Sequence, residues 1–292
     1  MLYSLVLSFL MLVVSFAEPV TLMVYNLQNF LESEQYRKGE VVGTRYKPDD
    51  EIAAVVEVIV RHRPQILGLC EIGTTEDLAH LQQLLSAEGL DYPYVEHVEA
   101  ADSARRLALL STYPILERRS QTTLTYRIGG DVFPLRRGVL HVVLEVNGAP
   151  LHLVGVHLKS KRPSEQGDEA LMRLKEAFLV RDHVEATLEE APAETRLLLY
   201  GDCNDHYRSP PLNVLKGAYQ SPMRLTPLDL KDANGQHWTH YWKYNRLYST
   251  FDYALSNAAL LPVIDKKASY IDGAAPVMEA SDHRPLIVRM RL

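Results

Sequence analysis

The most constraining feature of this sequence is a set of short apolar runs that border polar side chains. The runs at 22–25, 66–70, 153–156 and 197–201 each end at such residues, and the run at 285–288 follows them. The polar residues are Asn26, Glu71, His157, Asp202, Asn204, Asp282 and His283. A buried carboxylate is costly unless it is paired or binds a metal. We therefore interpret these positions as strand ends that converge on one shared pocket.

The side-chain types in this set suit a hard divalent cation. Mg²⁺ prefers oxygen ligands, commonly one or two carboxylates together with water and substrate phosphate. Glu71 and Asp282 offer carboxylates, and Asn26 offers a neutral amide oxygen. The pattern predicts a Mg²⁺ site, with Mn²⁺ or Ca²⁺ as alternatives. A zinc site is disfavoured because the candidate pairs lack structural zinc spacing; they are His237 with His240 and Asp202 with His206.

Residues 18–292 are expected to form a single domain of the α/β class. Apolar, β-branched stretches predict strands at 19–27, 65–70, 196–200, 251–253 and 285–292. Helical spacing and end signals predict helices at 48–63, 74–89 and 164–190. Between about 92 and 158 strand patterns dominate, with a two-residue hairpin turn at Asn147-Gly148, whereas the polar stretch 28–48 predicts a loop. This order favours helices packed outside layered sheets.

The first 17 residues, MLYSLVLSFLMLVVSFA, form an apolar run without Lys or Arg. Ser15-Phe16-Ala17 has the small-x-small pattern of a signal-peptidase site. A membrane-spanning helix needs about 20 apolar residues, so an uncleaved anchor is the weaker alternative. We predict a signal peptide over 1–17, a secreted or periplasmic mature chain, and no membrane span after cleavage.

Composition and charge narrow the function classes. The 292 residues are 47% hydrophobic with a formal net charge of −6, which argues against a protein that coats nucleic acid nonspecifically. Between Arg105 and Arg162, however, ten Lys/Arg face three Asp/Glu, a local charge of +7. This segment either rims a cleft for a polyanion or forms a mixed solvated surface. Four aromatic residues either stack unpaired bases or pack internally: Tyr126, Trp238, Tyr241 and Trp242.

The two cysteines make no disulfide framework. Side chains alternate along a strand, so Cys70 should face away from Glu71, and Cys203 away from Asp202. If the acids face the pocket, both sulfurs face layers covered by helices. Two buried free thiols are therefore favoured over a disulfide.

Seven short motifs follow one another along the chain: VYNLQNF at 24–30, LCEI at 69–72, RGVL at 137–140, VHLKS at 156–160, YGDCND at 200–205, FDY at 251–253 and SDHRP at 281–285. In this order they resemble the endonuclease/exonuclease/phosphatase superfamily, the deoxyribonuclease-I-like fold, over essentially the whole mature chain. The resemblance implies a four-layer αββα sandwich of two packed mixed β-sheets flanked by helices. It also implies metal-assisted hydrolysis of phosphate esters at one end of the sheets.

The resemblance assigns a metal side to the pocket. Glu71 resembles the principal metal ligand of the family, Asn26 the residue that supports metal or phosphate beside it, and Asp282 a further carboxylate. Gln28 departs from members that carry an acid there. That departure leaves open whether one or two metals bind.

The resemblance also assigns a catalytic side. Asp202 matches the group that activates the attacking water, and Asn204 matches its partner, which contacts phosphate or holds Asp202. His283 resembles the histidine that protonates the leaving oxygen or stabilises the transition state, and Asp252 resembles the carboxylate that orients it. These side-chain types suit phosphodiester cleavage, which needs an activated water, a cation on the phosphate oxygens, and a group that protonates or stabilises the leaving oxygen. Two further residues match substrate-contacting positions: His157 and Arg137.

Together these features predict an exported, metal-dependent phosphodiesterase that acts on DNA or RNA and has no stable protein partner. A phosphatase or phospholipid phosphodiesterase would use the same machinery, because only the rim loops would differ. A catalytically silent binding module belongs to another class. The complete set Glu71, Asp202, Asn204 and His283 argues against that third possibility.

Overall fold

The structure, a computed structural model, describes residues 19–30, 32–37, 40–165 and 167–292. The predicted signal peptide at 1–17 lies outside these residues. Among the described residues, no helix combines the length and apolarity needed to span a membrane.

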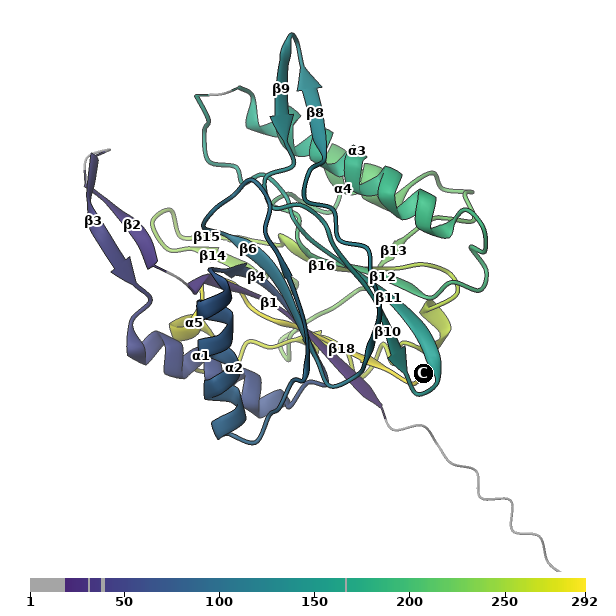
Figure 1. Cartoon of the computed structure of the whole chain (residues 1–292), viewed down its shortest axis with the longest axis horizontal. Coiled ribbons are helices and arrows are strands. Elements are labelled where there is room, and N and C mark those ends of the chain that lie inside the picture. The colour runs from purple at the N-terminus through teal and green to yellow at the C-terminus, as the bar shows by residue number, and fades with distance from the viewer. Residues whose placement is uncertain (1–18, 31, 38–39, 166) are drawn as a thin grey trace, which may run out of the picture.

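Two six-stranded sheets pack face to face in the centre of the molecule (Figure 1). The first sheet has the order β17 (Tyr270–Ile271), β18 (Leu286–Met290), β1 (Val20–Phe30), β4 (Ile66–Ile72), β6 (Arg106–Ser111) and β5 (Tyr94–Val98). The second has the order β13 (Thr226–Pro227), β16 (Asp252–Ser256), β12 (Leu197–Asp202), β11 (Ala149–His157), β10 (Leu140–Val146) and β7 (Ile115–Arg118). Both sheets are mixed, because β1 runs parallel to β4 and β11 parallel to β12 among antiparallel neighbours.

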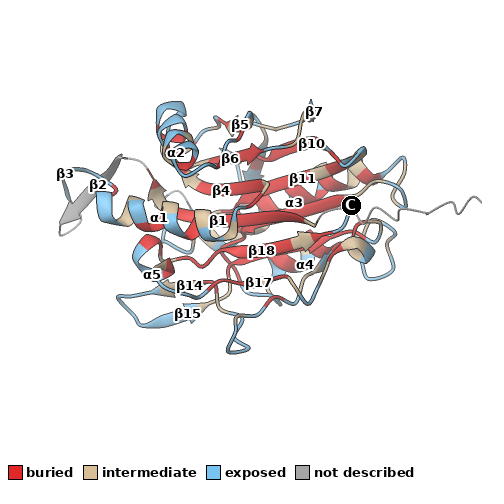
Figure 2. Ribbon diagram, turned by 90° about the horizontal axis from the view of Figure 1, so that it is seen from below, coloured by how far each residue is buried: buried red, intermediate tan, exposed pale blue. Residues whose placement is uncertain are grey.

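Three apolar clusters separate four layers. The first lies between the two sheets and includes Leu22, Leu109 and Val142. The second packs the first sheet against α1 (Asp49–His62), α2 (Thr75–Ala87) and α5 (Val277–Ala280). The third packs the second sheet against α3 (Glu169–Leu188) and α4 (Pro210–Lys216). Figure 2 shows the sheets as the buried centre and the exposed faces on the helices. The predicted αββα sandwich is confirmed.

The helices begin and end where their local chemistry dictates. Thr74 Oγ1 accepts a hydrogen bond from Asp77 N while the Asp77 carboxylate accepts from Thr74 N, so a capping box starts α2. The predicted helix at 164–190 begins later, at Glu169, because the Asp168 carboxylate caps it by accepting from Ala170 N and Leu171 N. The hairpin between β10 and β11 turns at Asn147 and Gly148, whose φ angles of 53° and 81° fit the predicted turn.

The loop predicted over 28–48 is wrong in most of its length. β1 continues to Phe30, and β2 (Glu32–Arg37) pairs antiparallel with β3 (Glu40–Tyr46). In Figure 1 this hairpin projects away from the body of the molecule, and every side chain of β3 is exposed. A strand whose side chains are all exposed, such as β3, needs no alternation of apolar residues, so its sequence gives no strand signal. Two further hairpins lie outside the sheets: β8 (Thr125–Ile128) with β9 (Asp131–Pro134), and β14 (His240–Trp242) with β15 (Leu247–Ser249).

Both cysteines are buried free thiols, as predicted. Cys203 packs in the cluster between the second sheet and its helices. The expected position of Cys70 is wrong, because it packs between the two sheets. Simple alternation fails there since Glu71, the next residue, has a φ of 61° and interrupts the register of β4 with both β1 and β6.

Candidate active site

Three of the predicted residues form a row across the second sheet. His157 ends β11 and pairs with Asp202 at the end of β12, and Asp202 pairs with Asp252 at the start of β16. Gly201 allows this close approach: its φ is 130°, and a Cβ there would lie 2.0 Å from the Val156 carbonyl oxygen. The row places an imidazole and two carboxylates side by side at one end of the sandwich.

His283 completes this row from the C-terminal segment. Its Nδ1 lies 2.8 Å from Asp252 Oδ2, a hydrogen bond between two buried side chains. Its Nε2 lies 3.8 Å from Asp202 Oδ2 and 3.9 Å from Asp282 Oδ1. These two contacts are too long for hydrogen bonds, so Nε2 faces carboxylates without being bonded to them. The imidazole is thus oriented by Asp252 and directed toward Asp202.

Two amides hold Asp202 in place. Asn26 Nδ2, from β1 of the first sheet, donates to Asp202 Oδ2 at 3.1 Å. Asn204 N donates to Asp202 Oδ1 at 2.8 Å, and Asn204 Nδ2 donates to the Leu158 carbonyl at 3.0 Å. Asn204 adopts a left-handed φ of 51° to do so, a conformation that asparagine tolerates better than most residues. Both oxygens of Asp202 are therefore fixed, one by each sheet.

Glu71 reaches the same place through a β-bulge. Its left-handed φ of 61° re-aims the side chain at the end of β4. Glu71 Oε2 accepts a hydrogen bond from Asn29 N at 3.0 Å and lies 3.6 Å from Arg105 Nε. Glu71 Oε1 lies 3.9 Å from His157 Nε2, which in turn is 3.6 Å from Asp202 Oδ2. His157 therefore stands between the predicted metal ligand and the predicted base.

Burial and neighbouring charges separate the protonation states of these groups. Burial and the nearby Asp252 carboxylate raise the pKa of Asp202 to about 7. Burial, with the positive charges of Arg137 and His283, lowers the pKa of His157 well below its usual range, so this imidazole is neutral. Burial alone would lower the pKa of His283, but Asp252 outweighs it and holds that pKa well above the usual range. One cationic and one neutral imidazole thus flank Asp202.

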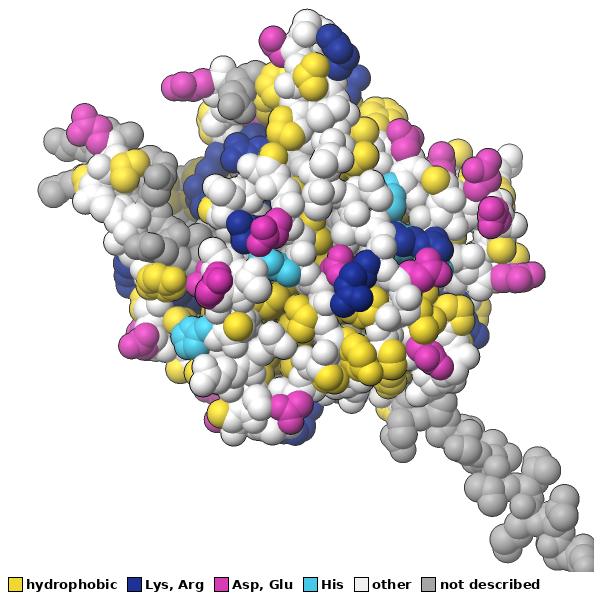
Figure 3. All heavy atoms as spheres, in the orientation of Figure 1, with side chains coloured by type: hydrophobic (Ala, Val, Ile, Leu, Met, Phe, Trp, Pro, Cys, Tyr) yellow, Lys and Arg dark blue, Asp and Glu magenta, His cyan; other side chains and the backbone are white. Residues whose placement is uncertain are grey.

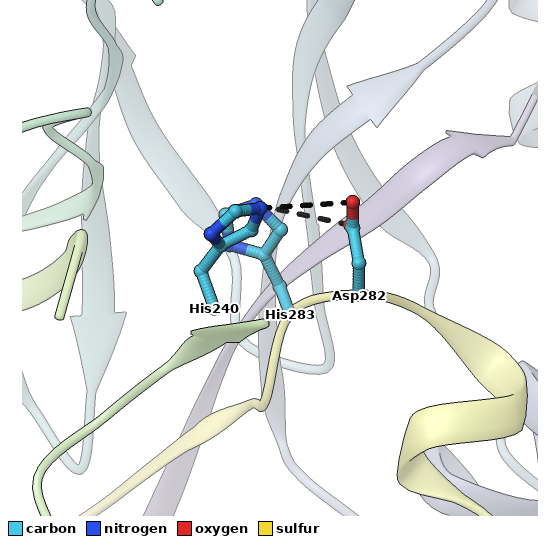
Figure 4. A group of neighbouring side chains, drawn as sticks. All are labelled: His240, Asp282 and His283. Carbon is cyan, nitrogen blue, oxygen red and sulfur yellow. Dashed lines mark ion pairs between the residues drawn. The ribbon is translucent and has the colours of Figure 1, made fainter. Parts of the chain in front are cut away.

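Asp282 lies on the solvent side of the cluster, with about a third of its side chain exposed. Figure 4 shows its carboxylate directed toward His240 and His283. His240 Nε2 is 3.7 Å from Asp282 Oδ2, and the two imidazole rings are 4.7 Å apart. Asp282 N donates to Gln28 Oε1 at 2.9 Å. Gln28, which stands where some family members have an acidic side chain, therefore positions Asp282.

The sequence-based interpretation did not include His240 in the site. Its strand faces His283 across an isolated bridge, and Tyr241 N donates to the Asp282 carbonyl at 2.9 Å. His237, the partner of His240 in the zinc pairing considered from the sequence, bonds the Leu230 carbonyl through Nδ1 at 3.0 Å. Among the described residues, His240 instead groups with Asp282 and His283. No local sequence signal distinguishes His240, since the contact depends on how β14 packs against a segment about 40 residues later.

The basic segment 105–162 does not present its charge as one patch. Most of its cations make ion pairs with acids, including Arg106 with Glu99, Arg118 with Glu96, Arg119 with Glu117, and Lys161 with Asp205. Acidic and basic side chains are interspersed on the face shown in Figure 3. Arg137 is buried with its Nε 3.0 Å from Asp102 Oδ2. Its charge reaches the site through its effect on His157.

Of the aromatic residues considered for base stacking, some pack internally and some are open to solvent. Tyr126 is buried and stacked on Phe133, with ring centroids 5.7 Å apart, so it packs internally. Trp242, by contrast, is half exposed.

The sequence matches the Endonuclease/Exonuclease/phosphatase family over residues 23–283. The chain belongs to this family. No curated protein matches the chain. Solved structures with the same fold include TDP2 of D. rerio humanized by 14 mutations, at 16% identity and a TM-score of 0.64 over 94% of this chain and 99% of that chain.

Two further structures share the fold. Sphingomyelinase C from Streptomyces griseocarneus is 16% identical, with a TM-score of 0.59 over 94% of this chain and 99% of that chain. A beta toxin double mutant from Staphylococcus aureus, solved with bound magnesium ions, is 16% identical with a TM-score of 0.63 over 94% of this chain and 100% of that chain. The family match confirms the predicted family, and the structural matches confirm the predicted fold.

Proposed function

We propose that this chain is an exported, divalent-metal-dependent phosphodiesterase that hydrolyses nucleic acid. The observation that carries this proposal is the arrangement of Asp252, His283 and Asp202. A charged imidazole, fixed through Nδ1, presents Nε2 toward a carboxylate that is held by amide donors. An acid and a base aimed at one small space are what hydrolysis of a phosphodiester requires.

In the proposed reaction, Asp202 accepts a proton from the attacking water. A pKa of about 7 suits a general base that works near neutral pH. His283 faces the same space. Its Nε2–H either donates a hydrogen bond that stabilises charge on the phosphorane-like transition state, or gives its proton to the leaving oxygen. Asp252 keeps the imidazole protonated and oriented. Asn204, His157 and Arg137 are proposed to contact the phosphate.

The oxygen donors beside this set fit a divalent cation. Glu71 Oε1 lies beyond hydrogen-bond distance of His157, and Asp282 is partly open to solvent. Glu71 and Asp282 would hold the ion, and the second lone pair of Asn26 Oδ1 would assist, because its first accepts Gln28 N at 3.0 Å. When bound, Mg²⁺, Mn²⁺ or Ca²⁺ would neutralise charge on the non-bridging phosphate oxygens. The related beta toxin with bound magnesium ions supports this assignment.

Export rests on the apolar run at 1–17 and its small-x-small end. The proposal therefore concerns the mature chain from residue 18, secreted or periplasmic, with nucleic acid as its substrate and no stable protein partner.

The test is hydrolysis by the purified mature chain in Mg²⁺, assayed on plasmid DNA, single-stranded DNA, RNA and sphingomyelin vesicles. We expect cleavage of nucleic acid, abolished by a chelator and reduced by about 10²–10⁴-fold in Asp202→Asn. Cleavage of sphingomyelin alone would replace the nuclease with a phospholipid phosphodiesterase. Inertness toward every diester would leave a binding module.

A further inference from the structure

The β14–β15 hairpin is built directly onto the catalytic segment. Thr239 is fully buried, its Oγ1 accepts from Phe251 N and Asp252 N at 3.0 Å each, and its carbonyl accepts from Arg284 N. Tyr241 N donates to the Asp282 carbonyl. The backbone of 239–241 is therefore fixed to both segments that carry the Asp252–His283 pair.

A buried cation braces the base of the hairpin. The Arg284 guanidinium lies 4.0 Å from the Trp238 ring centroid, and its Nη2 donates to Asp232 Oδ2 at 2.8 Å. Trp238 packs against Tyr248 at 4.8 Å, and Tyr248 stacks on Tyr241 at 4.6 Å and 23°. These contacts occupy one face of the two-stranded ribbon.

The opposite face of the ribbon points toward the site. Side chains two residues apart on a strand share a face, so Trp242 lies on the same face as His240, whose Nε2 is 3.7 Å from Asp282. Leu247 pairs with Trp242 across the ribbon. Trp242 is 50% exposed. It thus presents an aromatic ring to solvent, one strand repeat from a side chain of the site.

The charge of this hairpin suits an anionic ligand. Residues 233–251 contain Lys243 and Arg246 and no Asp or Glu, in a chain whose net charge is −6. Lipid insertion is disfavoured, because the exposed tip at 243–246 would carry both cations into hydrocarbon. A duplex is also a poor match, because its bases hide their faces in the stack, whereas unpaired bases stack on exposed rings.

From this placement we infer that Trp242 is a stacking platform for an unpaired base next to the scissile phosphate, so that the preferred substrate is single-stranded nucleic acid. The inference rests on the proposed function and extends it to a substrate class. Lys243 and Arg246 would neutralise the flanking phosphates. The opposite face of the ribbon is packed by Tyr241, Tyr248 and Trp238, which would not contact the base.

The experiment uses the fact that the chain has two tryptophans, both in this segment. Tryptophan emission of the mature Asp202→Asn protein is titrated with a dT oligonucleotide, with its duplex form, and with anionic or sphingomyelin vesicles. We expect the single strand to quench the emission of the Asp202→Asn protein, and we expect this quenching to be lost when Trp242→Ala is added. When Trp242→Phe is added instead, the affinity for a labelled oligonucleotide, measured by anisotropy, should be retained.

Kinetics in the active background complete the test. Trp242→Ala should raise KM for the single strand by about 5- to 100-fold, with a urea-unfolding midpoint close to that of wild type, which reports correct folding. Trp242→Phe should stay near wild type. The control is Tyr219→Ala, which removes a ring that is 82% exposed outside this hairpin.

Equal KM for wild type and Trp242→Ala would overturn the inference, as would an equal loss in Tyr219→Ala. Quenching by vesicles but not by the single strand would assign the hairpin to a membrane surface instead. If no nucleic acid is cleaved but the single strand still quenches, the proposed function fails while the binding platform stands. Cleavage without any effect of Trp242 rejects the platform alone.

Discussion

A chain of three histidines joins α3 to the second sheet: His141 on β10, His152 on β11 and His183 on α3. His141 Nδ1 lies 2.8 Å from His183 Nε2, and His141 Nε2 lies 3.2 Å from His152 Nδ1. His141 is fully buried. Burial, and then the neighbouring His183, lower the pKa of His141 to about 2. Burial also lowers the pKa of His152 and of His183.

The sign of the pH effect follows from these shifts. An unfolded histidine titrates near pH 6.5, above the folded value of about 2 for His141. The unfolded chain therefore binds the proton more readily, so this stabilising contribution is complete above pH 6.5 and is lost as the pH falls. At pH 5 the loss is about 2 kcal/mol, from roughly 1.5 pH units at about 1.4 kcal/mol each.

Urea unfolding of the mature protein and of His141→Phe, at pH 7.5 and pH 5, measures this contribution. His141→Phe should be less stable at pH 7.5 by about 1–3 kcal/mol, since it breaks buried hydrogen bonds. The difference in the free energy of unfolding between wild type and His141→Phe should be about 2 kcal/mol smaller at pH 5 than at pH 7.5. His80→Asn, at an exposed position, should follow the wild-type pH dependence. If wild type and His141→Phe lost the same free energy of unfolding between pH 7.5 and pH 5, the lowered pKa of His141 would make no contribution to stability.

Two further substitutions test the supports of the fold and the site. Thr74→Ala removes the capping side chain of α2 and should cost about 1 kcal/mol in urea unfolding, with the hydrolysis rate unchanged; an unchanged midpoint would contradict the assigned cap. Gly201→Ala would place a Cβ 2.0 Å from the Val156 carbonyl oxygen at a φ of 130°. The free energy of unfolding should therefore fall by about several kcal/mol, and the hydrolysis rate should fall more than about tenfold. Wild-type activity in Gly201→Ala would show that β12 need not approach β11 so closely.

The sequence was sufficient to predict the layers and to predict that these polar side chains meet at one end of the sandwich, because both depend on patterns along single strands. Apolar runs that stop at Asp202, Glu71 and His157 mark strand ends, and strand ends gather at an edge of the sandwich. The hairpin at Asn147-Gly148 and the cap at Thr74 are likewise local. Physical preferences within a few residues decide such features.

The remainder depends on contacts between distant segments. The left-handed backbone at Glu71 breaks the alternation from which the position of Cys70 was predicted. The placement of His240 beside His283 arises from the packing of β14 on the C-terminal segment. Every side chain of β3 is exposed, so this strand leaves no hydrophobic period to detect.

A double-mutant cycle measures whether Asp202 and His283 act as one hydrolytic unit. kcat/KM for a nucleic acid substrate in Mg²⁺ is measured for wild type, Asp202→Asn, His283→Gln and the double variant, with unfolding curves to confirm that each is folded. If the two residues do, each single change should lower kcat/KM by about 10²–10⁴-fold, and the double variant should be little slower than either one. Single variants that remain within a few-fold of wild type, or losses that multiply in the double variant, would contradict a shared hydrolytic role.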